Sequence, residues 1–464
     1  MQKHEAAREG AAVTRLDVLA ASSEVLSPMG AMKIVLPAFV ALSALVTVAA
    51  CVGDDPSAAP SSSSGDLPDA TPPRGEGGTP VCKGDTIEAC GAACATCAPP
   101  KDGHAACTNG TCEKACDGKA LCADSCVLTA TSLDHCGKCG HSCEGGQCSA
   151  GVCQPLQIVG GLVKTHAIDI SPTAGVVVSA DKNVVRCDAP NGCTPSTLKA
   201  VATGYLGLSD VAVAGSELFF VDQMGDVSRL VKCPLATGCP PPAASDANAV
   251  DVIVNRTLSR VVVAPGRLVY AVRGFNGPLI KTCVLPGCTT PTTVRPEQAS
   301  ATAADSDTAN PIVTVGASTT GVLYGSAVYG VGGVSVRGCT FPSCASPTNV
   351  GVGSGGAAMG VTFFNGKFYF ATTGGASDAI WTVTDGATTK TSVGSDAGGI
   401  SDLAVDASGF YWSNATTGKI LKCDLTGCAG GTLLASGQDG ATRIRTDAKF
   451  VYWMTPTAVF RLAK

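Results

Sequence analysis

The chain has 464 residues, a net charge of -5 and unusually many glycines, prolines and cysteines. Only 15% of the residues are charged, whereas 56 glycines and 27 prolines favour many short strands joined by turns over long amphipathic helices. The acidic balance and the lack of a Lys/Arg-rich run exclude nucleic acid as a partner, because phosphate binding requires a concentrated basic face. The 25 cysteines indicate an oxidising compartment, where disulfides are stable.

An export signal is predicted within residues 1–50. The stretch MGAMKIVLPAFVALSALVTVAAC contains the basic Lys33, then an apolar run, then small residues directly before Cys51. The run is too short for a membrane-spanning helix and fits a secretory signal peptide. Because residues 1–28 are polar, we expect translation to start at Met29 or Met32.

The end of this stretch, VAAC, resembles the lipobox of bacterial lipoproteins, in which the cysteine is diacylated and becomes the mature N-terminus. The resemblance implies a lipid on Cys51, which leaves 24 of the 25 cysteines, an even number, for disulfides. A plain signal anchor with a fortuitous cysteine is the alternative. Because Val52 rather than an aspartate follows the cysteine, resemblance to Gram-negative lipoproteins implies an outer-membrane lipoprotein in the cell envelope, facing the periplasm or the exterior.

Two segments that cannot form an ordinary hydrophobic core follow. Residues 51–81 comprise the lipidated N-terminus and a linker rich in Ser, Pro, Gly and Asp, which we predict to be a disordered tether. Residues 82–153 hold 14 cysteines in 72 residues, which predicts a small module stapled by up to seven disulfides of undetermined connectivity. The second half resembles short cysteine-rich repeats of secreted bacterial proteins, which implies a spacer or an interaction module.

The cysteine-rich module contains two Cys-x-x-Cys pairs that could bind zinc. These are Cys94 with Cys97 and Cys136 with Cys139, with His141 close to the second pair. In an exported protein oxidation to disulfides is favoured over metal binding. A haem attachment site is excluded, because that motif requires a histidine directly after the second cysteine. We therefore predict no metal and no cofactor.

Residues 154–464 contain a repeat with a period of about 42–50 residues. Each unit has the pattern of a four-stranded antiparallel blade, and the seventh unit lacks an outer strand that residues 154–163 can supply. A ring closed in this way leaves few exposed strand edges. The chain is therefore predicted to be all-β, with a β-propeller of seven blades, or six if the irregular unit near 310–350 is miscounted. The units begin near residues 166, 208, 259, 310, 357, 400 and 442.

Five units carry a cysteine pair where the third strand is expected to turn into the fourth. Opposed residues of antiparallel strands lie within disulfide distance, so each pair is predicted to clip the third strand to the outermost one, with a benefit of about 2 kcal/mol. In the one complete unit without a pair, Asp385 and Gly386 can form the turn alone. The predicted disulfides are Cys187–Cys193, Cys233–Cys239, Cys283–Cys288, Cys339–Cys344 and Cys423–Cys428.

The segments FYWSN and VYWMT in the last two units resemble the YWTD-type repeat of lipoprotein-receptor propellers. The resemblance implies a propeller with a binding habit but no particular ligand, and seven units depart from the six usual in that family. We expect the aromatic side chains of these segments to pack between blades rather than line a pocket. They are Tyr411, Trp412, Tyr452 and Trp453.

Few residues of the repeat suit catalysis. His166 is its only histidine, so a histidine-based triad or metal site within the ring is excluded. Asp169, Asp406 and Asp447 recur in or beside first strands, where we favour a role in bonding backbone N–H groups at turns over a role in the channel. No catalytic or ligand-binding residue is assigned, and the chain is not predicted to be an enzyme.

Three functions remain, in decreasing order of preference. The first is a membrane-anchored envelope lipoprotein that displays the propeller for binding or adhesion to a protein or a glycan. The second is a propeller enzyme, a lyase or hydrolase with acidic channel residues, which would show carboxylates or arginines converging on one channel mouth. The third is a structural envelope component without a specific ligand.

Overall fold

The computed structural model describes residues 85–464 apart from short gaps at 173–174, 190, 240–241, 243–247, 274–277, 297–311, 329–332, 355 and 375–376. The predicted signal region, Cys51, the linker and Cys82 lie outside the described residues. The described residues form strands and turns without helices, and so include no helix able to cross a membrane. Residues 78–464 belong to one compact unit.

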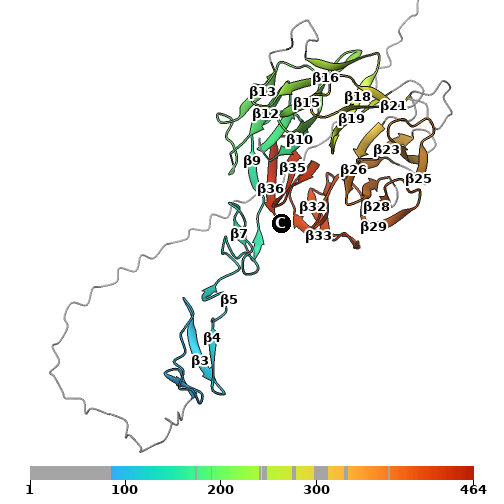
Figure 1. Ribbon diagram of the computed structural model, residues 1–464. Helices are drawn as coiled ribbons and strands as arrows, with labels where there is room; N and C mark the ends of the chain where they lie inside the picture. The colour runs from blue at the N-terminus through green and yellow to red at the C-terminus, as the bar shows by residue number, and fades with distance from the viewer. Residues whose placement is uncertain are drawn as a thin grey trace, which may run out of the picture. The chain divides into compact units, whose positions relative to one another are not determined.

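Seven four-stranded antiparallel sheets surround a common centre, as Figure 1 shows. In the first six sheets the strand order is the chain order, and the inner strands of neighbouring blades contact one another around the ring. The all-β fold and the seven blades are therefore confirmed. The alternative of six is wrong, because the irregular unit forms a complete fourth blade, β22–β25.

The strands of the first six blades have the following bounds. Blade 1 contains β10 (Thr165–Ser171), β11 (Gly175–Ala180), β12 (Asn183–Cys187) and β13 (Lys199–Thr203), and blade 2 contains β14 (Leu208–Ala214), β15 (Glu217–Met224), β16 (Val227–Pro234) and β17 (Ala249–Val254). Blade 3 contains β18 (Thr257–Ala264), β19 (Arg267–Arg273), β20 (Leu279–Val284) and β21 (Thr292–Arg295), and blade 4 contains β22 (Ile312–Ala317), β23 (Gly321–Val328), β24 (Gly333–Thr340) and β25 (Thr348–Ser354). Blade 5 contains β26 (Ala358–Phe364), β27 (Lys367–Thr372), β28 (Asp378–Thr384) and β29 (Lys390–Asp396), and blade 6 contains β30 (Ile400–Asp406), β31 (Gly409–Asn414), β32 (Lys419–Cys423) and β33 (Thr432–Ala435).

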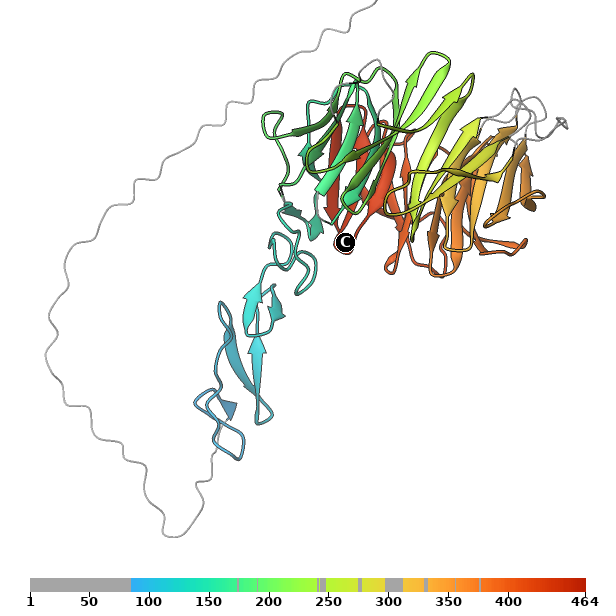
Figure 2. The ribbon, with the colours of Figure 1, turned by 45° about the horizontal axis from the view of Figure 1, so that its top comes forward.

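Blade 7 combines the two ends of the propeller. Its first three strands are β34 (Thr442–Thr446), β35 (Phe450–Thr455) and β36 (Ala458–Ala463), and its fourth is β9 (Leu156–Val159). Val159 pairs with Val459 in antiparallel register. The predicted exchange that closes the ring is thus present, and Figure 2 shows the ring from a second direction.

The signature aromatic residues pack between blades, as the sequence predicts. Trp412 and Trp453 are fully buried in separate interblade clusters. The indole N–H of Trp412 donates to Asp396 Oδ2 at 2.6 Å, and that of Trp453 donates to Gln438 Oε1 at 2.9 Å. Each ring therefore contributes buried apolar area while its polar atom stays hydrogen-bonded.

The cysteine-rich module consists of two copies of one two-disulfide unit joined by a short hairpin. Each copy contains five cysteines, of which the first bonds to the fourth and the third to the fifth, which gives Cys90–Cys107 and Cys97–Cys112, then Cys136–Cys148 and Cys143–Cys153. Cys116–Cys126 and Cys122–Cys139 lie between and across them. The strands are β1 (Asp85–Thr86), β2 (Ala89–Cys90), β3 (His104–Thr108), β4 (Thr111–Ala115), β5 (Ala120–Cys122), β6 (Ser125–Val127), β7 (Cys148–Ser149) and β8 (Val152–Cys153).

Backbone contacts repeat between the two copies. The N–H of Cys90 donates to Ala95 O and that of Cys136 to His141 O, each at 2.8 Å. Neither Cys-x-x-Cys pair is closed on itself, because Cys97, Cys136 and Cys139 bond elsewhere. Two groups of three cysteines have their sulfur atoms close enough together to hold a metal ion, but all six are disulfide-bonded. They are Cys90, Cys97 and Cys112 in one group and Cys136, Cys143 and Cys153 in the other.

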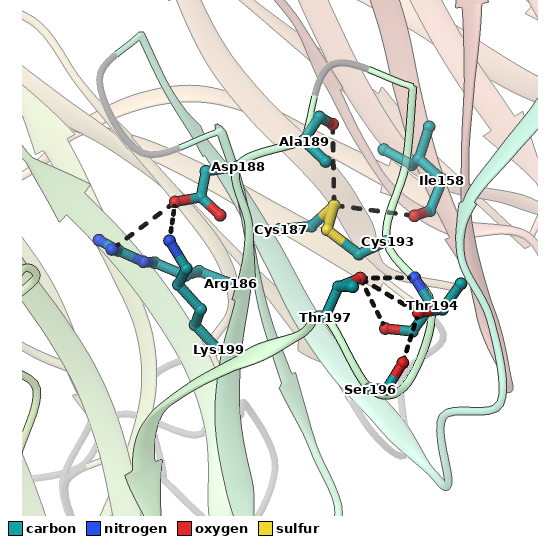
Figure 3. Close-up of a disulfide and its surroundings, with 10 residues drawn as sticks. All are labelled: Ile158, Arg186, Cys187, Asp188, Ala189, Cys193, Thr194, Ser196, Thr197 and Lys199. Carbon is teal, nitrogen blue, oxygen red and sulfur yellow. Dashed lines mark hydrogen bonds and ion pairs between the residues drawn. A yellow bond between two sulfur atoms is a disulfide. The ribbon is translucent and has the colours of Figure 1, made fainter.

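Each of the five blade disulfides joins the end of a third strand to the loop that follows it in the same blade, and in four of them this loop donates a backbone hydrogen bond to the preceding blade. Cys187 ends β12, whereas Cys193 lies in the loop before β13, and Figure 3 shows the disulfide with Cys187 Sγ beside Ile158 O of β9. The N–H of Cys193 donates to the same Ile158 O at 2.6 Å. The expectation of a strand-to-strand clip is wrong in this detail. A loop held by the disulfide instead covers the outer strand of the preceding blade.

The same contact recurs around the ring. The second cysteine of three further clips donates its N–H to the outer strand of the preceding blade, namely Cys239 to Val201 O, Cys344 to Val294 O and Cys428 to Val393 O, at 2.7, 2.7 and 2.9 Å. In the Cys283–Cys288 clip, the neighbouring Gly287 N–H donates to Glu217 Oε2 of blade 2. Blade 5 has the predicted turn at Asp385, whose carboxylate accepts from Ser318 Oγ of blade 4 at 2.5 Å.

Blade 7 has no cysteine pair of its own, and cysteines of the cysteine-rich module pack against it instead. The buried Cys136, Cys143 and Cys153 pack with Trp453 of blade 7 and Ala435 of the outer strand of blade 6. Arg461 Nη2 also donates to Glu144 O at 2.9 Å. The second copy of the two-disulfide unit therefore takes the place that a clip occupies in blades 1–4 and 6.

Candidate functional site

The inner strands of all seven blades share a β-bulge. In each blade the register between the first and second strand shifts in the first half of the first strand. A bulge inserts an extra residue and redirects the local side chains. Side chains at this point and two residues further along therefore face the propeller centre.

Residues at these two positions differ strongly between blades. Blades 1, 2, 3, 6 and 7 supply six charged side chains, which we call the channel cluster, whereas blades 4 and 5 supply glycine and threonine. Gly360 has φ +56°, and a Cβ there would lie 2.3 Å from Leu403 N, so no larger residue fits. The channel cluster consists of Asp169, Asp210, Arg260, Asp402, Arg443 and Arg445.

Ion pairs connect the channel cluster across five blades. Arg445 Nη1 donates to Asp402 Oδ2 at 3.0 Å, and its Nε lies 3.7 Å from Asp169 Oδ1. Arg260 Nη2 lies 3.5 Å from Asp402 Oδ1, and its Nη1 lies 3.9 Å from Asp210 Oδ1. Three carboxylates and three guanidinium groups thus occupy one network, which gives no net charge when all are ionised.

Two of the carboxylates also bond the next blade. Asp169 Oδ2 accepts from Val213 N at 2.7 Å, and Asp210 Oδ2 accepts from Val261 N at 2.9 Å. Burial raises the pKa of Asp169 and of Asp210, although nearby arginines and these N–H groups oppose the rise. Burial would lower the pKa of Arg445, but the surrounding carboxylates raise it overall.

A cavity of about 430 Å³ lies beside the channel cluster. The second of the two inward positions lines it in every blade, from Asp169 in β10 to Arg445 in β34. From the first position only Arg260 and Asp402 reach the lining. Charged groups from opposite sides of the ring therefore form one surface of a cavity whose other walls are largely valine and alanine.

The three aspartates named from the sequence have different environments. Asp169 lines the cavity, so the preferred role at a turn does not describe it fully. Asp406 Oδ1 accepts from Ser408 N at 2.7 Å, as expected for a turn residue, and its Oδ2 accepts from Thr446 Oγ1 and Lys464 Nζ. Asp447 accepts from the N–H groups of Lys449 and Phe450, each at 2.8 Å, as expected for a turn residue.

Sequence reasoning missed most of the channel cluster. His166 contributes its backbone, since its carbonyl accepts from Arg443 Nε at 3.3 Å. Asp210, Arg260 and Asp402 occupy one position of the repeat, directly before the apolar triplets VAV, VVV and LAV. Aligning the units on these triplets would have shown charges of both signs at a single inward position.

No protein-family model and no curated protein matches the sequence. Solved structures similar to this chain include a catalytically inactive virginiamycin B lyase from Staphylococcus aureus with quinupristin, at 10% identity and a TM-score of 0.48, covering 67% of this chain and 98% of that one. Another is the PQQ-bound aldose sugar dehydrogenase from Streptomyces coelicolor, at 11% identity and a TM-score of 0.42, covering 66% of this chain and 96% of that one. A third is a nidogen/laminin complex, at 15% identity and a TM-score of 0.37, covering 52% of this chain and 86% of that one. These likenesses carry no argument about the function of this chain.

Proposed function

We propose that the protein is an exported envelope lipoprotein that displays its propeller to bind a ligand at the central channel. The observation that carries the proposal is the cavity to which all seven inner strands contribute, with Asp169, Arg260, Asp402 and Arg445 in its lining. A concave, mostly apolar pocket with a few convergent polar groups is the usual form of a ligand site.

The sequence supports the cellular setting of this proposal. Cys51 follows a lipobox-like stretch, and the linker that follows would keep the described domains clear of the outer membrane. The disulfides of the described residues suit an oxidising compartment.

A binding screen tests the proposal. The purified mature chain, without lipid, is presented with cell-wall glycans, envelope proteins and small soluble metabolites, and binding is followed by calorimetry. We expect at least one ligand whose affinity falls when the channel residue Asp169 is replaced by asparagine. Uniform failure at high micromolar concentration, together with a deletion strain that lacks any binding or adhesion defect, would instead favour the purely structural role.

One observation favours an enzyme as the second candidate. Asp169 and Asp210 have raised pKa values beside arginines in the same channel, which is the sign expected for a lyase or hydrolase with acidic channel residues. Incubating the mature chain with each ligand from the screen and analysing the products by mass spectrometry separates the two candidates. Product formation that Asp169→Asn abolishes would support the enzyme, and unchanged ligand would support a binding protein.

A further inference from the structure

The charged groups most open to the cavity are a carboxylate and a guanidinium side by side. The side chains of Asp169 and Arg445 are 21% and 25% exposed, whereas those of Arg260 and Asp402 are 8% and 2% exposed. Asp169 Oδ2 already accepts a hydrogen bond from Val213 N, whereas Asp169 Oδ1 lies 3.7 Å from Arg445 Nε, beyond hydrogen-bond distance. A single polar group of a ligand in the cavity can therefore reach both the Asp169 carboxylate, an acceptor, and the Arg445 guanidinium, a donor.

The charge balance of the channel cluster selects against ions. The cavity lining holds two carboxylates and two guanidinium groups that are paired with one another, so an anionic or a cationic ligand must disrupt an existing ion pair. A hydroxyl group both donates and accepts. It can bond to Asp169 and Arg445 together without changing the net charge of the site.

The floor of the cavity retains unused hydrogen-bonding capacity. Arg260 is more than nine-tenths buried and lines the cavity, and its Nε and Nη1 have no hydrogen-bond partner among the described residues. Asp210 Oδ1 lies 3.9 Å from that Nη1 but does not line the cavity. Buried polar groups without partners are costly, so a ligand oxygen that accepts from the Arg260 guanidinium is stabilised.

The walls suit the apolar face of a ring. Val213, Phe363 and Val405 line the cavity, and Val263, which is 41% exposed, lies where the cavity meets solvent. The volume of about 430 Å³ is within the range of roughly 300–1,000 Å³ usual for small-molecule sites.

We infer that the channel cavity binds a neutral carbohydrate of one or two rings, with hydroxyl groups bonded between Asp169 and Arg445 and the ring face against the valines and Phe363. The inference rests on the proposed function, of which it names the ligand class. It requires no metal and no covalent step.

Calorimetric titration of the mature chain tests this ligand class. The neutral probes are N-acetylglucosamine, its β-1,4 dimer, cellobiose and maltose, and the comparison probes are glucuronate, glucosamine and a neutral dipeptide amide. We expect one neutral sugar to bind more tightly than every comparison probe. Asp169→Asn and Arg445→Met should each weaken that binding by about 10- to 100-fold, because each removes a hydrogen bond to a charged group.

A second pair of variants avoids the buried network. Val263→Trp places a large side chain at the solvent end of the cavity and should abolish sugar binding, whereas Val284→Trp, at a residue 66% exposed outside the cavity lining, should leave it unchanged. Equal circular dichroism spectra and melting temperatures show that both variants fold. This pair keeps the test valid if the charge variants are unstable.

The outcomes separate the ligand class from the proposed function. Tighter binding of a charged probe or the dipeptide, blocked by Val263→Trp, would overturn the carbohydrate and leave the channel as a binding site. If a sugar binds and neither Val263→Trp nor Asp169→Asn changes its affinity, the channel cavity is not the binding site. No binding by any probe, while a larger ligand from the broader screen does bind, would overturn this inference and leave only the proposed function.

Discussion

Aspartates at similar places in the repeat perform two different tasks. Asp406 and Asp447 bond backbone N–H groups of turns, whereas Asp169, Asp210 and Asp402 enter the channel cluster. The sequence allowed the first task to be predicted, because an aspartate followed by small or polar residues is typical of turns. It could not separate the second task, because the direction of a side chain after a bulge depends on the pairing register.

Asp406 provides a pH test of its local hydrogen bonds. Burial would raise the pKa of Asp406, but hydrogen bonds from Lys464, Ser408 and Thr446 lower it overall. The folded state thus binds this proton less tightly than the unfolded state, so the stabilisation is present above the unfolded pKa of 3.8 and is lost as pH falls through the folded pKa. Asp406→Asn should cost about 1 kcal/mol at neutral pH.

Urea unfolding of the wild type and Asp406→Asn between neutral and strongly acidic pH measures this effect. The gap between their unfolding free energies should narrow as pH falls below about 4. Asp424→Asn, at an exposed position, is the matched control and should show no such trend. A gap for Asp406→Asn that stays constant across this pH range would contradict the assignment.

Two glycines with positive φ allow the close packing of the channel to be measured. A Cβ at Gly360 would meet Leu403 N, whereas one at Gly266, with φ +75°, would meet no atom within 4 Å. Gly266→Ala should cost about 1 kcal/mol for the left-handed backbone alone. Gly360→Ala should cost about 1–3 kcal/mol more, since the inner strands of blades 5 and 6 must separate. Equal losses in chemical denaturation would refute the close contact.

At the level of strands and loops, the sequence pattern predicted which cysteines pair but not what their loops contact. The cysteine spacing and the unit boundaries predicted the paired sulfurs, since each pair recurs at one place in the repeat. The spacing did not reveal that Cys428 N–H donates to Val393 of the preceding blade, because contacts between blades leave no short-range signature. The clip loop thereby covers an edge that would otherwise be open to pairing with another chain.

Removing one clip should therefore loosen two blades. Replacing Cys423 and Cys428 together by serine should cost about 2 kcal/mol. Hydrogen exchange should accelerate in β29 of blade 5 as well as in β33 of blade 6, because the loop that covers β29 loses its tie to β32. The same double replacement of Cys187 and Cys193 is a control that should affect β9 instead. Faster hydrogen exchange in β33 alone would instead support the prediction that the disulfide ties only the third strand of blade 6 to its fourth.

At the level of the whole molecule, repeat counting predicted the seven-bladed ring and its closure by residues 154–163. It did not predict that the preceding module contributes to the ring. Cys143 and Cys153 pack against Trp453 and Ala435, so the last interblade cluster includes sulfurs from outside the repeat. The repeat begins after Cys153, and a contact between two unlike modules has no periodicity to detect.

Two fragments measure the contribution of the module. A fragment of residues 116–464 retains every cysteine pair of the second copy and the hairpin, and should unfold at the same denaturant concentration as the longer chain. A fragment of residues 154–464 keeps β9 but exposes Trp453 and Ala435, and should lose about 2–5 kcal/mol. Equal stability of the two fragments would show that the propeller does not need the module.

Mass spectrometry of the mature protein, isolated from its native envelope and digested without reduction, tests the central claim that export has committed the sulfurs to structure. We predict a diacylated Cys51 at the N-terminus, the five blade pairs from Cys187–Cys193 to Cys423–Cys428, and the first-to-fourth and third-to-fifth pairing among the five cysteines of each module copy. A mature chain with an unmodified Cys51 and most of its thiols free to react with an alkylating reagent would contradict the account.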